Sequence, residues 1–517
     1  MRELGFFDQF LISQGIVAIL VGFGITAVLA PYYFPGANLP VVFVLGTIPA
    51  IAMATVYSKL STLIPRSGGD YVWSSRIIGP FFGSVQTVFI FLTTVVAFSG
   101  FALWSSVALG LSTTFFGIGL GTRNTSLFHI GTGLSSASLG YPVVLVLIVL
   151  VTFLAILSLR TYSRFQRIAM SFVFLMTAVF IVALFVSNPS TVSASFDSGM
   201  KMAGYNTTYG GIISKAASSG FSSSGFNWTN TILASIPWGF LTFTGFNYGT
   251  YLAGETKNVK SSIFKALMLS VFITLVALVV MAFGTYYLFG STFLNAADYV
   301  ASTTSLLPAL PAPMFLLAFV NPTVGAIVGL AFFISDIVVA AAYIITISRV
   351  LFAVSFDRML PSAFSSVGDK FHTPHWAIIF TGVISAIYST IYWNFSFAST
   401  WLNTSIVFPI GYLLPLVAIL LFPYVKKDLF ARVGGTKRDA TLLTVGSLVG
   451  IGSFVFYAFA ETYPIASGVF LGASLTIAYL FMVVLFIIGV IVYFTAKVRL
   501  NRMGMKLDGV YSEIPPE

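Results

Sequence analysis

The chain contains twelve long apolar stretches, and this feature limits its possible folds more than any other. Hydrophobic residues make up 57% of the 517 residues and charged residues only 8%, against roughly 25% charged residues in soluble proteins. About 20 consecutive apolar residues are enough for a helix to cross a bilayer. The sequence therefore predicts an all-α polytopic protein embedded in a lipid bilayer. The predicted spans are residues 10–33, 40–63, 83–110, 141–159, 166–187, 232–253, 263–290, 324–352, 375–393, 401–425, 441–460 and 466–495.

Basic residues are distributed unevenly between the two sides that these spans define. With the N-terminus placed in the cytoplasm, 22 of the 25 Lys and Arg residues fall on the inner side, and only Arg123, Lys201 and Lys215 fall outside. Cytoplasmic loops of membrane proteins carry such an excess. We therefore expect both termini in the cytoplasm. The net charge of +10 is then an orientation signal, and no nucleic-acid partner is expected.

The chain lacks the residues that several other classes of protein need. The spans are too uniformly apolar for an outer-membrane barrel, whose strands alternate in polarity. Without cysteine there is no thiolate metal site and no cysteine nucleophile. His129, His372 and His375 lie in loops or at a span edge, and no phosphate-binding loop or nucleophile elbow is present. We expect no enzymatic activity, no metal and no cofactor. A channel is disfavoured because only Asp336 marks the deep interior.

Two spans carry paired glycines near their middle. The first span contains Gly22 and Gly24, and the sixth contains Gly245 and Gly249. A helix interrupted inside a membrane is tolerated where the freed backbone groups line a cavity or bind a ligand. Matching interruptions five spans apart indicate the central site of a transporter built from inverted repeats. Close packing of helices through small residues is the alternative explanation.

Interrupted helices offer unpaired backbone groups to a ligand. Free N–H groups at the start of one half-helix favour a carboxylate, and free C=O groups at the end of the other favour an ammonium group or a cation. A zwitterion needs both. Phe23, Phe243 and Phe246 flank the glycines and are candidates to cover such a ligand, unless they face lipid or the protein core.

Three longer motifs, together with the sequence GFGI at residues 22–25, resemble the amino acid–polyamine–organocation (APC) superfamily over residues 10–425. They are YSKLSTLIPRSGGDYVWSSRIIGPFFG after the second span, GETKNVKSSI after the sixth and SRVLFAVSFDRMLPSAFSSVGDKFHTP after the eighth. The resemblance implies the leucine-transporter fold, in which an inverted repeat of five plus five helices precedes two further helices. Residues 1–187 would form the first repeat, 188–231 an extracellular loop, 232–425 the second repeat, and 426–517 the last two helices and a cytoplasmic tail.

The resemblance also implies a function and a site. It implies a secondary active amino acid transporter of the plasma membrane that works by alternating access. Backbone groups of Gly22, Phe23, Gly24 and Ile25 would bind the substrate's carboxylate and amine. The opposite wall would consist of Phe243, Thr244, Gly245, Phe246 and Asn247, and Tyr343 would also line the site. The loop after the second span and the end of the eighth would belong to the inner gate.

Departures from the family pattern bear on the substrate. Many members that transport cationic amino acids carry an acidic residue where this chain has Asn247. Some members carry a gating Trp where Leu241 stands, and Val259 replaces a usual proline. A neutral or apolar amino acid is therefore favoured over arginine or a polyamine, which remain the alternative.

Asp336 lies well inside the eighth predicted span. A carboxylate there costs roughly 2.5–3.5 kcal/mol on insertion scales and marks a functional site by default. It is a candidate for proton coupling or for contact with a substrate amine, and a structural hydrogen bond is the alternative. Some proton-coupled relatives carry a lysine in the fifth span, which this chain lacks. We favour proton symport, with sodium coupling and exchange as the alternatives.

Overall fold

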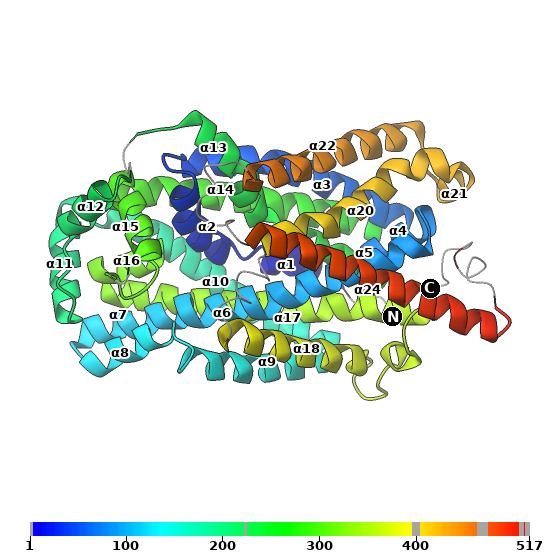
Figure 1. Ribbon diagram of the computed structural model, residues 1–517, viewed down its shortest axis with the longest axis horizontal. Coiled ribbons are helices and arrows are strands. Elements are labelled where there is room, and N and C mark those ends of the chain that lie inside the picture. Colours follow the sequence, from blue (N-terminus) through cyan, green and yellow to red (C-terminus); the bar gives the residue numbers. More distant parts are fainter. Residues whose placement is uncertain are drawn as a thin grey trace.

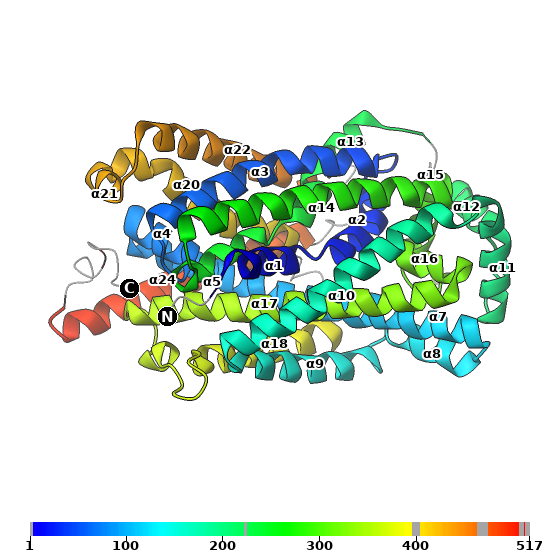
Figure 2. The ribbon, with the colours of Figure 1, turned by 180° about the vertical axis from the view of Figure 1, so that it is seen from behind.

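A computed structural model describes residues 4–221, 225–304, 306–394, 404–462, 474–505 and 511. Over these residues the regular elements are helices, with one isolated bridge between Leu4 and Thr256. Most of the long helices run along the long axis of an elongated bundle (Figures 1 and 2). The predicted all-α architecture is therefore confirmed for the described residues.

The helices of the first 187 residues are α1 (Phe6–Val17), α2 (Ile19–Tyr33), α3 (Leu39–Leu63), α4 (Gly69–Ile77), α5 (Pro80–Val95), the π-helical segments η1 (Val96–Ala102) and η2 (Ser106–Leu111) on either side of α6 (Leu103–Ser105), α7 (Ser112–Thr122), α8 (Thr125–Gly133), α9 (Gly140–Ile156) and α10 (Leu159–Val186).

Residues 188–425 contain the 3₁₀ turn η3 (Pro189–Thr191), α11 (Val192–Met202), α12 (Tyr209–Ser218), α13 (Trp228–Ala234), π-helical η4 (Ser235–Phe240), 3₁₀-helical η5 (Leu241–Phe243) and η6 (Phe246–Glu255), α14 (Val259–Phe289), α15 (Ser291–Thr303), α16 (Pro313–Val320), α17 (Pro322–Phe356), η7 (Ser362–Ser365), α18 (His375–Asn394) and α20 (Thr404–Val425). The remaining helices are α21 (Lys427–Arg432), α22 (Lys437–Thr462) and α24 (Ser474–Arg502).

Nine helices in the described ranges are long and apolar enough to cross a membrane. Two shorter apolar helices, Gly140–Ile156 and Gly411–Val425, overlap the fourth and tenth predicted spans. The sixth predicted span corresponds to the interrupted series from α13 to η6. The chain is thus a multi-pass membrane protein, whereas the total of twelve spans and the inverted repeat remain predictions.

The outer surface of the bundle is apolar. On α9 and α10, Val149, Ile168 and Val186 are 67%, 75% and 79% exposed. Large aliphatic side chains gathered at such exposure face lipid in a membrane protein, because lipid tails are as apolar as the side chains themselves. The centre is occupied by α17, which packs against α1, α7 and α10.

Short helices cover one end of the bundle. The stretch 188–231, predicted to be an extracellular loop, contains α11 and α12, which lie with α15 and α16 at the left end in Figure 1. Tyr209 of α12 stacks on Phe293 of α15 with ring centroids 3.9 Å apart. The opposite end carries α4, α21 and the start of α1, and the charge distribution predicts that this end is cytoplasmic.

Candidate substrate site

The first helix is interrupted at Ala18. Helix α1 ends at Val17 and α2 begins at Ile19, with Ala18 between them in the left-handed conformation (φ 47°, ψ 71°). The break was expected at Gly22 and Gly24, and that expectation is wrong, because both glycines lie inside α2. The Gly22 N–H is already used, since it donates to the Ala18 carbonyl at 2.9 Å.

Gly22 and Gly24 serve close packing. A Cβ added at Gly22 would lie 2.5 Å from Cγ2 of Thr242, and one added at Gly24 would lie 2.8 Å from Cε of Met314. These separations are shorter than real Cβ contacts allow. The alternative explanation for this glycine pair, close approach through small residues, therefore accounts for the geometry.

The sixth predicted span is interrupted where expected, at Gly245. Segment η5 ends at Phe243, Thr244 is extended, and Gly245 adopts φ +98° before η6 begins. An L-residue rarely adopts this conformation, so glycine is required by the backbone itself. Gly249 lies within η6 and packs against α1, since a Cβ there would lie 2.7 Å from Oγ of Ser13.

The two interruptions lie against each other. A Cβ at Gly245 would lie 2.3 Å from Cγ2 of Ile16, two residues before Ala18. On the far side of the breaks, the hydroxyls of Thr26 and Thr242 are 2.9 Å apart. The four half-helices therefore converge on one point inside the bundle.

Backbone groups at this point lack intrahelical partners. Ile19, Leu20 and Val21 are the first residues of α2, and Phe246 and Asn247 are the first of η6, so their N–H groups have no carbonyl one turn earlier within their own helix. Neither Ala18 nor Gly245 supplies a side-chain cap. A helix start with free N–H groups carries a partial positive charge and attracts an anion, and the ends of α1 and η5 carry the complementary carbonyls.

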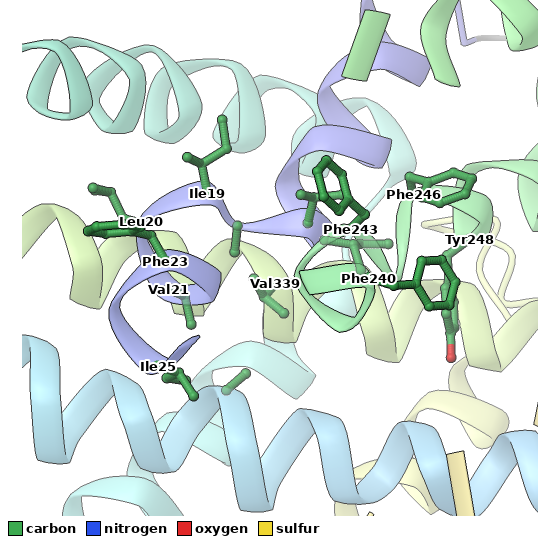
Figure 3. Close-up of a cluster of buried hydrophobic side chains, with 14 of the residues drawn as sticks. Ile19, Leu20, Val21, Phe23, Ile25, Phe240, Phe243, Phe246, Tyr248 and Val339 are labelled. Carbon is green, nitrogen blue, oxygen red and sulfur yellow. The ribbon is translucent and has the colours of Figure 1, made fainter. Parts of the chain in front are cut away.

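The surroundings of the breaks are apolar. Figure 3 shows Ile19, Leu20 and Val21 at the start of α2, Phe240, Phe243 and Phe246 on the facing segment, and Val339 of α17. Phe243 and Phe246 are buried, as is Ile25. Phe23, expected to cover a ligand with them, instead packs against Phe43 and Phe180 at centroid distances of 6.2 and 6.3 Å, on the side of α2 remote from Phe243.

A cluster of tyrosines adjoins the second break. The amide oxygen of Asn247 accepts from the Tyr412 hydroxyl at 3.4 Å, while its buried Nδ2 has no hydrogen-bond partner in the described chain. Tyr343 reaches η6 through Tyr248, with the two rings edge to face at 5.4 Å. Tyr248 also approaches the Thr94 hydroxyl at 3.2 Å. Sequence analysis missed Tyr248 and Tyr412, although the position of Tyr248 between Asn247 and Gly249 was a signal for it.

Asp336 is fully buried on α17. Its Oδ2 accepts from the Ser105 hydroxyl at 2.7 Å, and its Oδ1 has no partner in the described chain. Ser105 lies in α6, between the π-helical segments η1 and η2. Such segments are frequent at functional sites because they displace backbone and side chains from regular helical positions. Val338, two residues further along the same helix, touches α1 near Gly15, so the two residues face different neighbours and Asp336 is directed at α6.

One buried and one partly buried ion pair close the predicted cytoplasmic end. Nη2 of Arg76, on α4, lies 2.7 Å from Oδ1 of Asp357 at the end of α17, and Nε of Arg349 lies 3.1 Å from Oε1 of Glu255 at the end of η6. The second pair borders a cavity of about 710 Å³ that is also lined by His372. These pairs link the segments that the sequence predicts to form an inner gate.

Asp70 joins the same region from α4. Its Oδ2 accepts from the hydroxyls of Tyr251 at 2.6 Å and Tyr57 at 3.4 Å. Burial raises the pKa of Asp70 to about 7, although both hydrogen bonds act to lower it. The preceding Gly69 (φ +40°) is needed because a Cβ there would lie 2.2 Å from the Tyr251 ring.

No metal site is apparent in the described ranges, where no three His, Asp or Glu side chains gather closely enough to hold an ion. The breaks instead offer backbone dipoles and an apolar wall, and the buried carboxylate of Asp336 faces α6.

Comparison with known proteins identifies the family. Residues 4–511 match the family model described as amino acid permease. The chain belongs to the amino acid permease family. The permease is 24% identical over 405 residues to the branched-chain amino acid permease BcaP of Bacillus subtilis (strain 168), covering 75% of each chain. It is 26% identical over 401 residues to the methylthioribose transporter of the same organism, covering 74% of each. It is a membrane transporter with an amino acid substrate and not an enzyme.

Proposed function

We propose that this permease imports neutral, apolar amino acids across the plasma membrane by alternating access and proton symport. The observation that carries the proposal is the convergence of two interrupted helices, each with a new helix start at its break, inside an apolar wall. The dipoles suit the charged ends of a zwitterion, and the wall suits an aliphatic side chain.

Contacts with the substrate follow from the positions of the breaks. The substrate carboxylate binds the N–H groups of Ile19, Leu20 and Val21, displaced from the expected Gly22–Ile25 stretch because α2 begins three residues earlier, at Ile19. The ammonium group binds the carbonyls at the ends of α1 and η5. Phe243, Thr244, Gly245, Phe246 and Asn247 form the facing wall, with Tyr343 behind it through Tyr248.

The apolar side-chain preference has two supports. The residues at the breaks carry no charge, so a guanidinium or a polyamine has no acidic partner there. A relative covering three quarters of the chain is named a branched-chain amino acid permease. Proton coupling is supported by Asp336, because a carboxylate buried inside a membrane-spanning helix with an unpartnered Oδ1 is costly and marks a functional site.

Uptake by proteoliposomes tests the substrate. Labelled leucine is measured against excess unlabelled leucine, valine, arginine, spermidine or methylthioribose. We expect saturable uptake that leucine and valine inhibit and the other three do not. Inhibition mainly by arginine or spermidine would overturn the substrate class. Asn247→Asp provides a matched variant, because an added carboxylate at this wall should weaken leucine inhibition and strengthen arginine inhibition.

A separate experiment tests coupling. Leucine accumulation is measured under an inward proton gradient, an inward sodium gradient, or neither gradient with unlabelled leucine inside. We expect accumulation with the proton gradient alone. Accumulation driven only by sodium, or transport only as exchange, would refute symport with protons and leave the substrate assignment intact.

A further inference from the structure

The Arg76–Asp357 pair is enclosed by protein. The Arg76 and Asp357 side chains are 2% and 5% exposed. The Tyr71 hydroxyl donates to Oδ2 of Asp357 at 2.7 Å, so the carboxylate is held by two residues of α4. Breaking a buried pair of this kind is costly because it leaves an uncompensated charge out of water.

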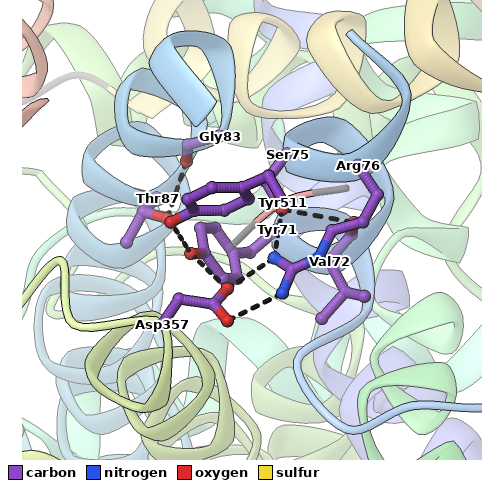
Figure 4. Close-up of polar contacts among 8 residues, drawn as sticks. All are labelled: Tyr71, Val72, Ser75, Arg76, Gly83, Thr87, Asp357 and Tyr511. Atoms are coloured by element: carbon purple, nitrogen blue, oxygen red, sulfur yellow. Dashed lines mark hydrogen bonds and ion pairs between the residues drawn. The ribbon is translucent and has the colours of Figure 1, made fainter. Parts of the chain in front are cut away.

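The last described residue of the chain completes this enclosure. Tyr511 is 7% exposed, its ring lies 4.6 Å below Cζ of Arg76, and its hydroxyl lies 2.9 Å from the Tyr71 hydroxyl (Figure 4). The only hydroxyl proton of Tyr71 is directed at Asp357, so Tyr511 donates to the Tyr71 oxygen. Tyr511, from the C-terminal tail, therefore covers the guanidinium of Arg76 and orients Tyr71, which donates to Asp357.

The end of α24 is attached to the same turn. Arg499 donates from Nη2 to the carbonyl of Arg358, the residue after Asp357, and to the carbonyl of Leu360 at 3.4 Å. Arg358 in turn contacts Sδ of Met505 through Nη1. These contacts, independent of Tyr511, direct the tail towards the end of α17.

We propose that Tyr511 is a positioning residue of the inner gate, which holds the Arg76–Asp357 pair together and thereby sets how readily the permease opens to the cytoplasm. The proposal rests on the alternating-access function above. In this gate, α4 and the end of α17 separate when the inner side opens. The ring of Tyr511 keeps water from Arg76 and adds a cation–π contact to the closed state, so its loss favours opening.

The chain contains no cysteine, which permits a direct test of opening. Ser13 on α1 is fully buried beside Gly249, so a Ser13→Cys reporter reacts with a maleimide only when the inner side opens. The reaction rate is measured in the purified full chain, without substrate, with and without Tyr511→Ala. A cation–π contact of ordinary strength corresponds to a rate increase of about 3- to 30-fold. Equal rates overturn the proposal.

Three further variants separate positioning from general destabilisation. Tyr511→Phe retains the ring over Arg76 and should restore most of the slow labelling. Phe494→Ala removes an aromatic ring from the lipid-exposed face of α24 and should leave labelling unchanged. In an Arg76→Gln background, Tyr511→Ala should add no further increase. A full additional increase there would show that Tyr511 does not act through Arg76.

The substrate proposal and this one fail independently. Labelling needs no substrate, so an incorrect substrate class leaves the result unchanged. In transport, Tyr511→Ala should alter the maximal rate of exchange more than the KM for leucine, because Tyr511 touches no break residue. A changed KM with unchanged labelling would assign Tyr511 to substrate binding and refute the gate role.

Discussion

Replacement of Gly245 by alanine tests the geometry of the interrupted helix most directly. The residue has φ +98°, and the added Cβ would lie 2.3 Å from Cγ2 of Ile16. An L-residue in the left-handed region costs about 1–2 kcal/mol. Ile16 belongs to the last turn of α1, so relief of the contact requires α1 to move away from the break.

The magnitude follows from two costs. Contacts below 3.0 Å are not tolerated by real Cβ atoms, and inserting a methyl group into a packed interior costs about 1–3 kcal/mol. Together with the backbone cost, Gly245→Ala should destabilise the observed conformation by about 2–5 kcal/mol. The cost of the inserted methyl group alone, about 1–3 kcal/mol, corresponds to a loss of transport rate of about 5- to 150-fold.

Gly204→Ala is the matched control. Gly204 also has positive φ (+86°), just after α11, where the Tyr205 N–H donates to the Met200 carbonyl as in a left-handed helix terminus, but a Cβ there meets nothing within 4 Å. It should cost only the backbone term, about 1–2 kcal/mol, and should retain transport.

The assay combines thermal melting of the purified protein with initial rates of leucine exchange in proteoliposomes. We expect Gly245→Ala to melt below Gly204→Ala and to transport at least fivefold more slowly. Equal melting temperatures and equal rates would refute the packing of α1 against the second break. The more drastic Gly245→Leu and Gly24→Leu should abolish uptake while still inserting into the membrane.

Three other predictions follow from buried groups. Asp336→Asn should abolish pH-driven accumulation of leucine and leave exchange intact, and unchanged accumulation would exclude Asp336 from coupling. Asp298 lies in α15, outside the spans, and burial raises its pKa well above the ordinary value. The folded protein therefore keeps its full stability below about pH 4, where Asp298 is neutral in both the folded and the unfolded state. As pH rises towards the folded pKa, the free energy of unfolding falls by about 1.4 kcal/mol per pH unit. Melting of Asp298→Asn should therefore match wild type near pH 4 and exceed it increasingly at higher pH, and parallel profiles would contradict this. Gly46→Ala should lower the melting temperature, because its Cβ would lie 2.4 Å from the backbone of Gly239, whereas Gly452→Ala, with nothing within 4 Å, should not.

The position of one helix break followed from sequence and that of the other did not. Gly245 was identified because it lies with Gly249 near the middle of its span, matching the glycine pair five spans earlier, and its backbone has φ +98°. In the first span the same glycine signal pointed to Gly22 and Gly24, yet the break falls at Ala18. A glycine marks either a bend or a close approach, and only its neighbours in space decide between the two. Those neighbours, Thr242 and Met314, lie more than 200 residues away.

The sequence by itself determined that this chain forms apolar helices crossing a membrane, because hydropathy is a local property that adds up along each span. Short motifs in the sequence also pointed to the family, and paired glycines pointed to the break at Gly245. Only the tertiary structure decided where the first helix breaks, how Phe23 turns away from the breaks, and that Tyr511 meets Arg76 and Tyr71. Those outcomes depend on contacts between segments far apart in the chain, whose distances and orientations arise only when the bundle packs.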